Sequence, residues 1–376
     1  MIWDRHAAAL ADFVTHPASR WRAPVAAVPR HQFVPQWWQR CPEGWMLHSG
    51  PADEEAWLAA AYQDTSLITR VGPLHADHAK PDDHPEGWPT SSATLPSLLV
   101  RMFQHARIGE RDELLDVGTG SGYGTALAAL RLSDLQVTSV DVDPYLVDAA
   151  RERLDRIRLR PRLAAVDATG ELPGAYDRIV ATVGVRPVPA SWLAALRPGG
   201  RLVTTIGGTT LIVTAEKRED GSAVGRVEWD RAGFMRTRHG EDYPPASRDV
   251  LAVVRELDGE QVTTSPYPVL DVEQAWDLAS MLDLTVPGIL CGYAEEEGQR
   301  TAWLAHEDGS WARATAIGTE PPTVVHQGGP QRLWDALDEI RAYWLQHGEL
   351  PVRGANVLIT PDGQTRLARG SWRAVL

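Results

Sequence analysis

Short apolar runs separated by amphipathic segments define the middle of this chain. The runs are too short for helices and occupy residues 114–117, 137–142, 176–183 and 201–206. Apolar residues at helical spacing follow the first two runs, up to residue 130 and over residues 144–157. Strands that alternate with helices in this way predict an α/β fold, with a mostly parallel, doubly wound sheet and helices on both faces.

The flanking parts of the chain follow other patterns. Amphipathic helices are expected at residues 3–14 and 95–106, and a polar, proline-containing stretch at 233–248 is typical of a linker. Beyond this stretch we expect a helix, a hairpin, a strong helix and a last hairpin, at residues 272–282, around 307–310, at 330–347 and around 360–363. We therefore divide the chain into an N-terminal helical segment, a central α/β domain and a small C-terminal α+β domain, with bounds 1–75, 76–235 and 246–376.

Glycine is concentrated directly after the first central strand. Gly118, Gly120, Gly122 and Gly124 follow Leu114 to Val117, and a helical pattern continues from them. A strand, a glycine-rich turn and a helix bring bare backbone N–H groups, at the positive end of the helix, next to any ligand bound there. A Cβ would block that approach, and some of these positions need a positive φ.

The spacing of these glycines distinguishes between two cofactors. The dinucleotide fingerprint G-x-G-x-x-G does not fit, because its third glycine would fall on Tyr123 or Thr125. The sequence is D-x-G-x-G-x-G, from Asp116 to Gly122, and it is similar to motif I of the Rossmann-like methyltransferases that bind S-adenosylmethionine. The next strand carries Asp141 near its end, where an acid can accept hydrogen bonds from a ribose.

Charge and composition exclude several other classes of protein. The net charge is −13 and no cluster of Lys and Arg stands out, which argues against a nucleic-acid partner. No run of residues approaches the ~20 apolar residues of a membrane span. The two cysteines, Cys41 and Cys291, have no metal-type spacing, so we expect a reduced, cytoplasmic protein without a metal site.

With these motifs in view, the first ~235 residues resemble the protein-L-isoaspartate O-methyltransferase family. Four segments carry the resemblance: Val28 to Pro35 (VPRHQFVP), Ala61 to Asp64 (AYQD), Thr90 to Ala93 (TSSA) and Val117 to Tyr123 (VGTGSGY). The fold implied is that of a class I methyltransferase. The activity implied is transfer of a methyl group from S-adenosylmethionine to an Asp or isoAsp carboxylate in a peptide.

The resemblance also implies roles for individual residues. Ser92 falls where the family has a serine hydroxyl at the acceptor carboxylate, and Thr90 and Ser91 beside it are expected to bind substrate. The expected cofactor-binding residues are Asp116, Gly118, Thr119, Gly120, Ser121, Gly122, Tyr123, Asp141, Val142, Asp167 and Ala168. Two positions depart from the family pattern: Ala168 replaces a glycine and Thr94 replaces a proline.

The chemistry implied needs no general base. A carboxylate with a pKa of about 3.9 is already ionised at neutral pH, so catalysis reduces to excluding water and aligning the oxygen with the methyl–sulfonium bond. The methyl ester is a better electrophile than the acid. The next backbone nitrogen can close on it to form a succinimide, or aspartimide.

The C-terminal ~140 residues exceed the minimal repair enzyme. The chain in this respect resembles the extended family members of ribosomal peptide biosynthesis (graspetide, lasso peptide and lanthipeptide), in which a precursor peptide is modified. General repair of isoaspartyl proteins is the alternative. The C-terminal domain either recognises a peptide or only braces the catalytic fold. Likewise, its tryptophans either fill a core or line a peptide groove: Trp276, Trp303, Trp311, Trp334, Trp344 and Trp372.

Two further groups of residues are open to more than one interpretation. Arg186 lies in a loop at the ligand-binding edge of the sheet, and either pairs with a substrate carboxylate or forms a structural ion pair. The polar stretch 74–87 contains three His and three Asp residues without a standard metal spacing. We expect an exposed loop there, and a lid over the site rather than a metal centre.

Overall fold

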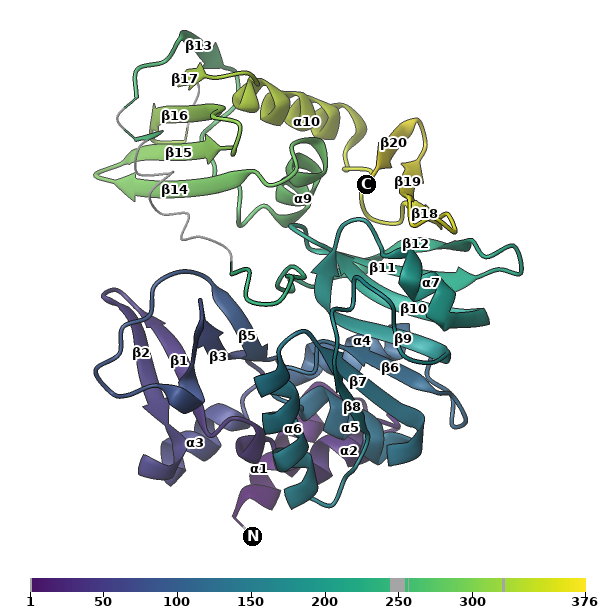
Figure 1. The fold of residues 1–376 in the computed structure, drawn as a ribbon. Coiled ribbons are helices and arrows are strands. Elements are labelled where there is room, and N and C mark those ends of the chain that lie inside the picture. Colours follow the sequence, from purple (N-terminus) through teal and green to yellow (C-terminus); the bar gives the residue numbers. More distant parts are fainter. Residues whose placement is uncertain (1, 244–253, 256, 320–321) are drawn as a thin grey trace.

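A computed structural model of the chain describes residues 2–243, 254–255, 257–319 and 322–376. Across these residues the strands form three sheets, one of ten strands and two of five (Figure 1). No helix within the described ranges is long and apolar enough to cross a membrane.

The largest sheet contains the predicted α/β unit. Its parallel part has the order β10-β9-β6-β7-β8, with helices before and between the strands, which confirms the predicted fold class. The strands are β6 (Leu114–Val117), β7 (Val137–Asp141), β8 (Arg162–Ala165), β9 (Tyr176–Val185) and β10 (Leu196–Ile206). The helices are α4 (Pro96–His105), α5 (Tyr123–Arg131), α6 (Pro144–Arg156) and α7 (Ala190–Ala195).

The N-terminal segment differs from the helical prediction for residues 1–75. Besides α1 (Trp3–Val14), α2 (Arg22–Ala27) and α3 (Glu54–Ala61), it contributes most of a five-stranded sheet. The strands are β1 (Gln36–Cys41), β2 (Gly44–Ser49), β3 (Leu67–Val71), β4 (Leu74–His75) and β5 (Pro89–Ala93).

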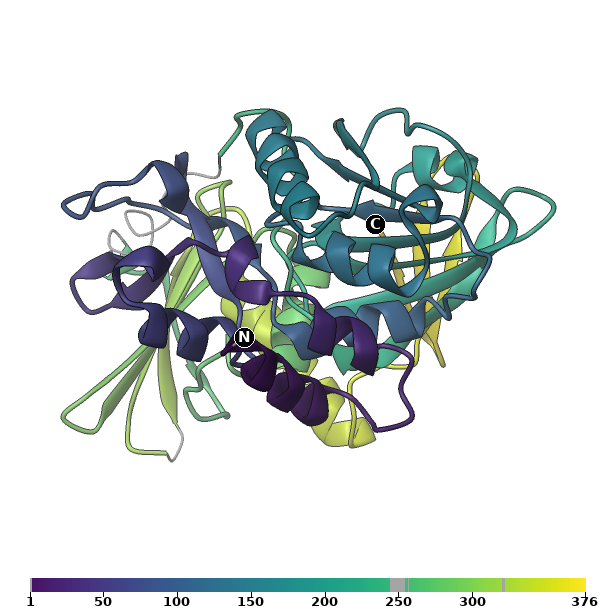
Figure 2. The same ribbon diagram turned by 90° about the horizontal axis from the view of Figure 1, so that it is seen from below.

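The helical prediction was wrong for β1 because its two adjacent tryptophans are buried on opposite faces of the strand. Trp37 packs into the main N-terminal cluster, whereas Trp38 packs with Trp45 and Val71 on the other side. Adjacent buried tryptophans hide the alternation of apolar and polar residues by which a strand is normally found. In Figure 2, α1 and α2 (purple) lie beneath the central domain, where they contact α4 and α5 respectively.

The C-terminal region divides between two sheets. The strands β13 (Gln261–Ser265), β14 (Leu290–Glu296), β15 (Gln299–Ala305), β16 (Trp311–Ile317) and β17 (Thr323–Gly328) form their own antiparallel sheet beside α9 (Trp276–Thr285) and α10 (Leu333–His347). Helix α10 ends at Gly348, whose φ of 77° confirms the predicted C-terminal cap. Part of the predicted linker, residues 244–248, lies outside the described residues.

The chain then returns to the central sheet. Strands β18 (Asn356–Ile359), β19 (Thr365–Arg369) and β20 (Trp372–Val375) extend it beyond β11 (Leu211–Lys217) and β12 (Ala223–Arg231) (Figure 1). Strand β18 pairs antiparallel with β12, from Ala223 opposite Ile359 to Arg226 opposite Asn356. The last strands of the predicted C-terminal domain thus belong to the central sheet, so the described part of that domain does not form a separate unit.

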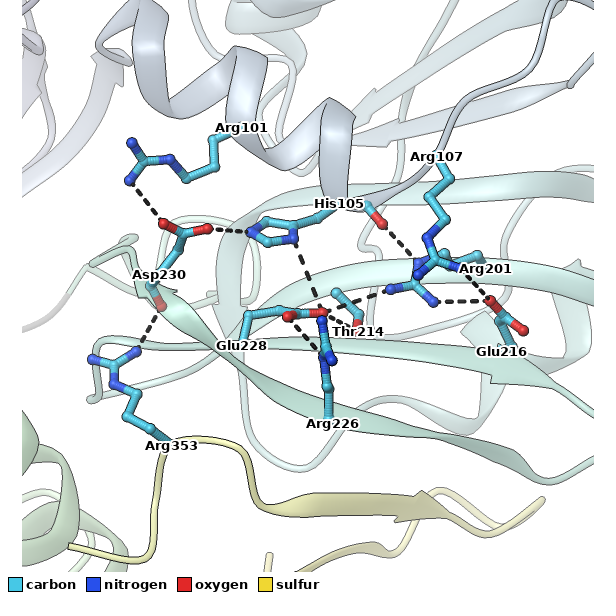
Figure 3. Close-up of polar contacts among 10 residues, drawn as sticks. All are labelled: Arg101, His105, Arg107, Arg201, Thr214, Glu216, Arg226, Glu228, Asp230 and Arg353. Carbon is cyan, nitrogen blue, oxygen red and sulfur yellow. Dashed lines mark hydrogen bonds and ion pairs between the residues drawn. The ribbon is translucent and has the colours of Figure 1, made fainter. Parts of the chain in front are cut away.

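A charged network fixes α4 against the antiparallel part of this sheet (Figure 3). Its centre is Glu228, which is 3% exposed and accepts hydrogen bonds from Thr214 (2.7 Å) and Arg226 (2.9 Å). Arg201 lies 3.6 Å from the same carboxylate and 2.9 Å from Glu216. His105 at the end of α4 lies 2.9 Å from Asp230, so the network spans four elements.

Two carboxylates of this network offer a matched pair of variants. Replacing Glu228 by alanine leaves Arg201 without its buried partner, so we expect Glu228→Ala to lower the free energy of unfolding by roughly 3 kcal/mol. Glu216 contacts the same arginine, but its side chain is 51% exposed. Glu216→Ala should therefore cost less than about 1 kcal/mol in chemical denaturation. Equal losses for the two variants would contradict the central role of Glu228.

Candidate functional site

The loop after β6 is fastened to the neighbouring strand β7 by its own backbone. The N–H groups of Gly118 and Thr119 both donate to the carbonyl of Val140, over 2.9 and 3.2 Å. The N–H of Gly120 donates to the Asp141 carboxylate over 2.9 Å. The loop therefore lies at the carboxyl edge of the parallel strands, where open α/β sheets bind their ligands.

Three of the four glycines in this loop are required by conformation. Gly118, Gly120 and Gly122 have φ values of 97°, 50° and 89°, in the region that side chains rarely adopt. Space is short as well, since a Cβ on Gly122 would lie 2.9 Å from Ala150 of α6. The glycine pattern therefore reflects a tight turn into α5 that keeps the backbone close to any bound ligand.

Asp116 lies at the end of β6, directly before this loop, and its side chain is buried. It is 2% exposed, and its carboxylate accepts hydrogen bonds from Thr125 (2.7 Å) and Ser139 (2.9 Å). Burial raises the pKa of Asp116 to about 6, although the two hydroxyl donors partly oppose the shift. The structure shows a supporting role for Asp116, because both residues that bind its carboxylate belong to the protein core, and its contact with a cofactor stays a prediction.

The other side chains of the motif are also turned inward. Thr119, Ser121 and Tyr123 are all buried, and the Thr119 hydroxyl lies 2.7 Å from that of Ser139. Any contact that these residues make with a ligand therefore comes from the backbone. Arg30, from the VPRHQFVP segment, places its guanidinium over the Tyr123 ring and donates to the carbonyls of Ala61 and Thr65.

Asp141 has the geometry of a ribose-binding acid. Its Oδ2 accepts from the Gly120 N–H and its Oδ1 from the Asp143 N–H (3.1 Å), which leaves a lone pair on each oxygen for further donors. Burial raises its pKa, and the two backbone donors oppose the shift. Val142 follows it at the partly exposed edge. An adenosyl cofactor fits this donor and acceptor set, since it offers two ribose hydroxyls to one carboxylate.

Asp167 and Ala168 lie at the next position along the edge, after β8. Asp167 accepts from the Thr169 amide (2.9 Å) and hydroxyl (2.7 Å), and its other oxygen lies 2.7 Å from His239. Burial would raise the pKa of Asp167, but the bonds from Thr169 and His239 hold it below its ordinary value. The Ala168 carbonyl accepts from the indole of Trp192 over 2.7 Å, which fixes this turn.

Strand β5 brings the predicted acceptor site beside the glycine loop. A Cβ built on Gly120 would lie 3.3 Å from the carbonyl oxygen of Ser92. The hydroxyl of Thr90 donates to the Gly72 carbonyl (2.6 Å), and that of Ser91 accepts from Thr69 (3.0 Å). Across the described residues the Ser92 hydroxyl has no such partner. Of the three predicted residues, Ser92 alone keeps its hydroxyl available, while the other two hold the strand in place.

Arg186 is committed to the C-terminal region and not to a substrate. It forms an ion pair of 2.7 Å with Asp283 of α9 and donates to the carbonyls of Asp283 and Leu284. Asp283 also pairs with Arg236 at 3.1 Å. The structural ion pair is thus the correct alternative, and the substrate-binding interpretation was wrong.

Several residues that the sequence did not single out also lie at this edge. Arg70 of β3 forms a buried ion pair with Asp143, donates to the Tyr243 hydroxyl (2.9 Å) and joins the sheet of β5 to the start of α6. Burial would raise the pKa of Asp143, but Arg70 and then Arg238, at 3.2 Å, keep it low. Only their charge marks these residues in the sequence, because their partners lie far away along the chain.

The predicted linker contributes to the same edge. The N–H of Gly184 donates to Met235 (2.8 Å), and the Gly184 carbonyl accepts from Thr237 (2.9 Å). With the contacts of Arg238 and His239 described above, residues 235–243 cross the ends of β9, β8 and α6. This stretch is therefore a strap over the site and not a free connection.

The histidine-rich stretch 74–87 is partly buried, contrary to the predicted exposed loop. His75 is 1% exposed, and burial lowers its pKa to about 4. Asp77 forms an ion pair with Arg153 of α6 and accepts from Tyr145 over 2.8 Å. The stretch thus docks on α6 because its acids meet a buried arginine there. No group of three or more His, Cys, Asp or Glu among the described residues has the arrangement of a metal site.

The family model and the sequence relatives that match this chain carry the same description. Residues 54–232 match the family model described as protein-L-isoaspartate(D-aspartate) O-methyltransferase (PCMT). A protein-L-isoaspartate O-methyltransferase of Methanoculleus marisnigri is 31% identical over 211 residues, which cover 55% of this chain and 76% of the relative. That of Methylibium petroleiphilum is 29% identical over 231 residues, covering 58% and 71%.

Among solved structures, a protein-L-isoaspartate O-methyltransferase aligns with a TM-score of 0.49 at 16% identity. The alignment covers 100% of this chain and 99% of that one. The family model ends at residue 232, before the strap and the C-terminal sheet.

The buried acid before the loop predicts a pH dependence of stability. Because the folded-state pKa of Asp116 is raised from 3.8 to about 6, the neutral acid stabilises the fold at low pH. This contribution is lost as the pH rises through 6, by up to about 3 kcal/mol. Asp116→Asn does not titrate, so its stability relative to the wild type should increase between about pH 4 and pH 7 in denaturant titrations. A stability difference that stays constant over this pH range would contradict the assignment.

Proposed function

The chain belongs to the protein-L-isoaspartate O-methyltransferase family, whose cofactor is S-adenosylmethionine, and from this premise we propose the reaction that it performs. It methylates the free α-carboxylate of an isoaspartyl residue in a protein or peptide, yielding a methyl ester and S-adenosylhomocysteine. Two observations carry the proposal: the backbone carbonyl of Ser92 lies next to Gly120, and the Ser92 hydroxyl has no hydrogen-bond partner among the described residues. A residue that can donate to a carboxylate thus belongs to the strand that packs against a loop suited to an adenosyl cofactor.

Residues at the carboxyl edge would hold the cofactor. The backbone of Gly118 to Gly122 would contact its amino-acid part, Asp141 its ribose, and Val142, Asp167 and Ala168 its adenine end. Bound in this way, the cofactor supplies a methyl group on a positively charged sulfur. Asp116 serves the same site indirectly, because its bonds to Thr125 and Ser139 hold the strand and helix that flank the loop.

The chain's own residues orient the acceptor. We assign to Ser92 a hydrogen bond to one oxygen of the substrate carboxylate, which leaves the other oxygen free to attack. That oxygen forms a bond to the methyl carbon as the carbon–sulfur bond breaks, and no proton moves. The neighbouring backbone nitrogen of the substrate can then attack the ester carbonyl. Methanol leaves with the amide proton, and a succinimide remains.

A second candidate substrate is an aspartate in a specific precursor peptide, for which the succinimide would be the product. The observation that favours it is the size of the region outside the family match, residues 233–376, which includes a complete sheet of its own. A repair enzyme must accept many sequences, whereas an enzyme of peptide biosynthesis needs one. The two candidates share the site and differ in the acceptor.

Two synthetic peptides that differ only in one linkage distinguish these candidates. We expect the full-length chain, incubated with S-adenosylmethionine, to add one methyl group to the isoAsp peptide, followed by net loss of one water. The Asp peptide should remain unchanged. Mass spectrometry reads both outcomes, and modification of the Asp peptide alone would favour the precursor peptide. A chain that modifies neither peptide nor any isoAsp protein would refute the proposed function.

The role of Ser92 predicts a selective loss of rate. Ser92→Ala removes one orienting hydrogen bond, and since the charge on the carboxylate decreases in the transition state, we expect a modest fall in kcat of about 10- to 100-fold. Cofactor binding should be preserved, which is measured as an unchanged rise of Tm with S-adenosylmethionine. If the variant loses this rise, Ser92 acts on the cofactor, and the assignment to the acceptor is wrong.

A further inference from the structure

A groove of about 450 Å³ lies where the central sheet meets the C-terminal helices, away from the glycine loop. Strand β12 supplies Trp229 and Arg231, α9 supplies Trp276, and α10 supplies Trp344 (these elements are labelled in Figure 1). We propose that this tryptophan groove binds a segment of the polypeptide substrate that contains an aromatic and an acidic residue. The inference rests on the proposed function and adds a second contact with the same substrate.

The groove concentrates exposed aromatic surface. Trp229, Trp344 and Trp276 are 63%, 46% and 37% exposed, whereas Trp303, Trp311 and Trp334 of the same region are buried. Exposed tryptophans that face one hollow are typical of binding surfaces, since their burial releases much apolar area. The sequence left a core and a peptide groove as alternatives for the tryptophans after residue 246. Of these, Trp276 and Trp344 line the groove, whereas the three buried ones belong to the core.

Charge in the groove selects an acidic partner. Its two carboxylates are already neutralised, Asp277 by Arg353 at 2.9 Å and Glu349 by Arg369 at 2.8 Å. Arg231 is exposed and stacks on the Trp276 ring, and no acid within the described ranges pairs with it. The groove therefore offers one free cation held flat on an aromatic ring, which suits a carboxylate beside an apolar side chain.

The position of the groove connects it with the catalytic edge. Strand β11 is antiparallel to both β10 and β12, so β12 runs in the direction of the parallel strands. Trp229 and Arg231 at its end therefore lie on the same edge of the sheet as the glycine loop. Between β12 and β6 there are four strand spacings, or about 19 Å at ~4.8 Å each.

This distance sets the spacing in the substrate. An extended chain covers ~3.3 Å per residue, so about six residues separate the methylated acid from the residues in the groove. A glycine also allows the Trp229 ring to pack closely on the backbone beside the groove. A Cβ on Gly354 would lie 3.1 Å from that ring. A flanking segment of one bound polypeptide can thus occupy both places.

Kinetics with designed peptides test the proposal on the full-length chain. A five-residue isoAsp peptide is compared with longer peptides that carry a Trp–Glu pair three, six or ten residues from the acceptor, on either side. We expect the six-residue spacing on one side to lower KM about tenfold relative to the short peptide, with kcat unchanged. Equal KM values at every spacing would contradict the proposal that the groove binds part of the substrate. Failure to methylate any peptide, the short one included, would instead refute the proposed function.

Matched variants test whether the lower KM of the longer peptide depends on the groove. Trp229→Ala and Arg231→Glu should each remove the advantage of the long peptide and leave kcat and KM for the short peptide unchanged. The controls are Phe13→Ala and Arg111→Glu, which change an exposed aromatic residue and an exposed arginine outside the groove. If the control variants lose as much of the KM advantage of the long peptide, the effect does not come from the groove and the proposal is wrong. It is also wrong if Trp229→Ala dissociates a dimer in sedimentation experiments, because the groove then binds a second copy of the chain.

Discussion

The attachment of one loop to one strand is the constraint on which the site depends. Val140 and Asp141 at the end of β7 accept the N–H groups of Gly118, Thr119 and Gly120. Such contacts require positive φ values, so only glycine serves at the three turning positions. The carboxylate of Asp141 fixes the loop and also keeps free lone pairs at the edge of the sheet. The loop geometry and the proposed contact with a ribose therefore depend on the same side chain.

Elements distant in sequence complete this arrangement. Strand β5 lies against the loop through the backbone of Ser92, and Arg70 of the adjacent strand pairs with Asp143 at the start of α6. The strap at residues 235–243 then binds the ends of β9, β8 and α6. The site is thus enclosed by the N-terminal sheet on one side and by a segment beyond the family match on the other.

Bracing and recognition are compatible roles for the C-terminal region. Arg186 and Arg236 both bind Asp283 of α9, and β18 adds a strand to the central sheet, so the region stabilises the catalytic fold. The segment between α10 and β18, which leads the chain back to the central sheet, lines one side of the tryptophan groove. A deletion of residues 246–376 would remove β18 from its pairing with β12 and leave β12 as an edge strand. For this reason point variants separate the two roles better than truncation does.

The sequence alone determined the local elements: the parallel strands, the glycine turn, Asp141 at the end of β7 and the cap of α10 at Gly348. These depend on short-range periodicity and on the conformational freedom of glycine, which neighbouring residues reveal. Only the tertiary structure decided which polar groups remain available. Asp116, Thr90, Ser91 and Arg186 are each bound by partners elsewhere in the chain, whereas the Ser92 hydroxyl has no partner in the part of the chain that the structure describes. A residue's chemistry is local, but the partners that satisfy it come from long-range packing, which periodicity does not record.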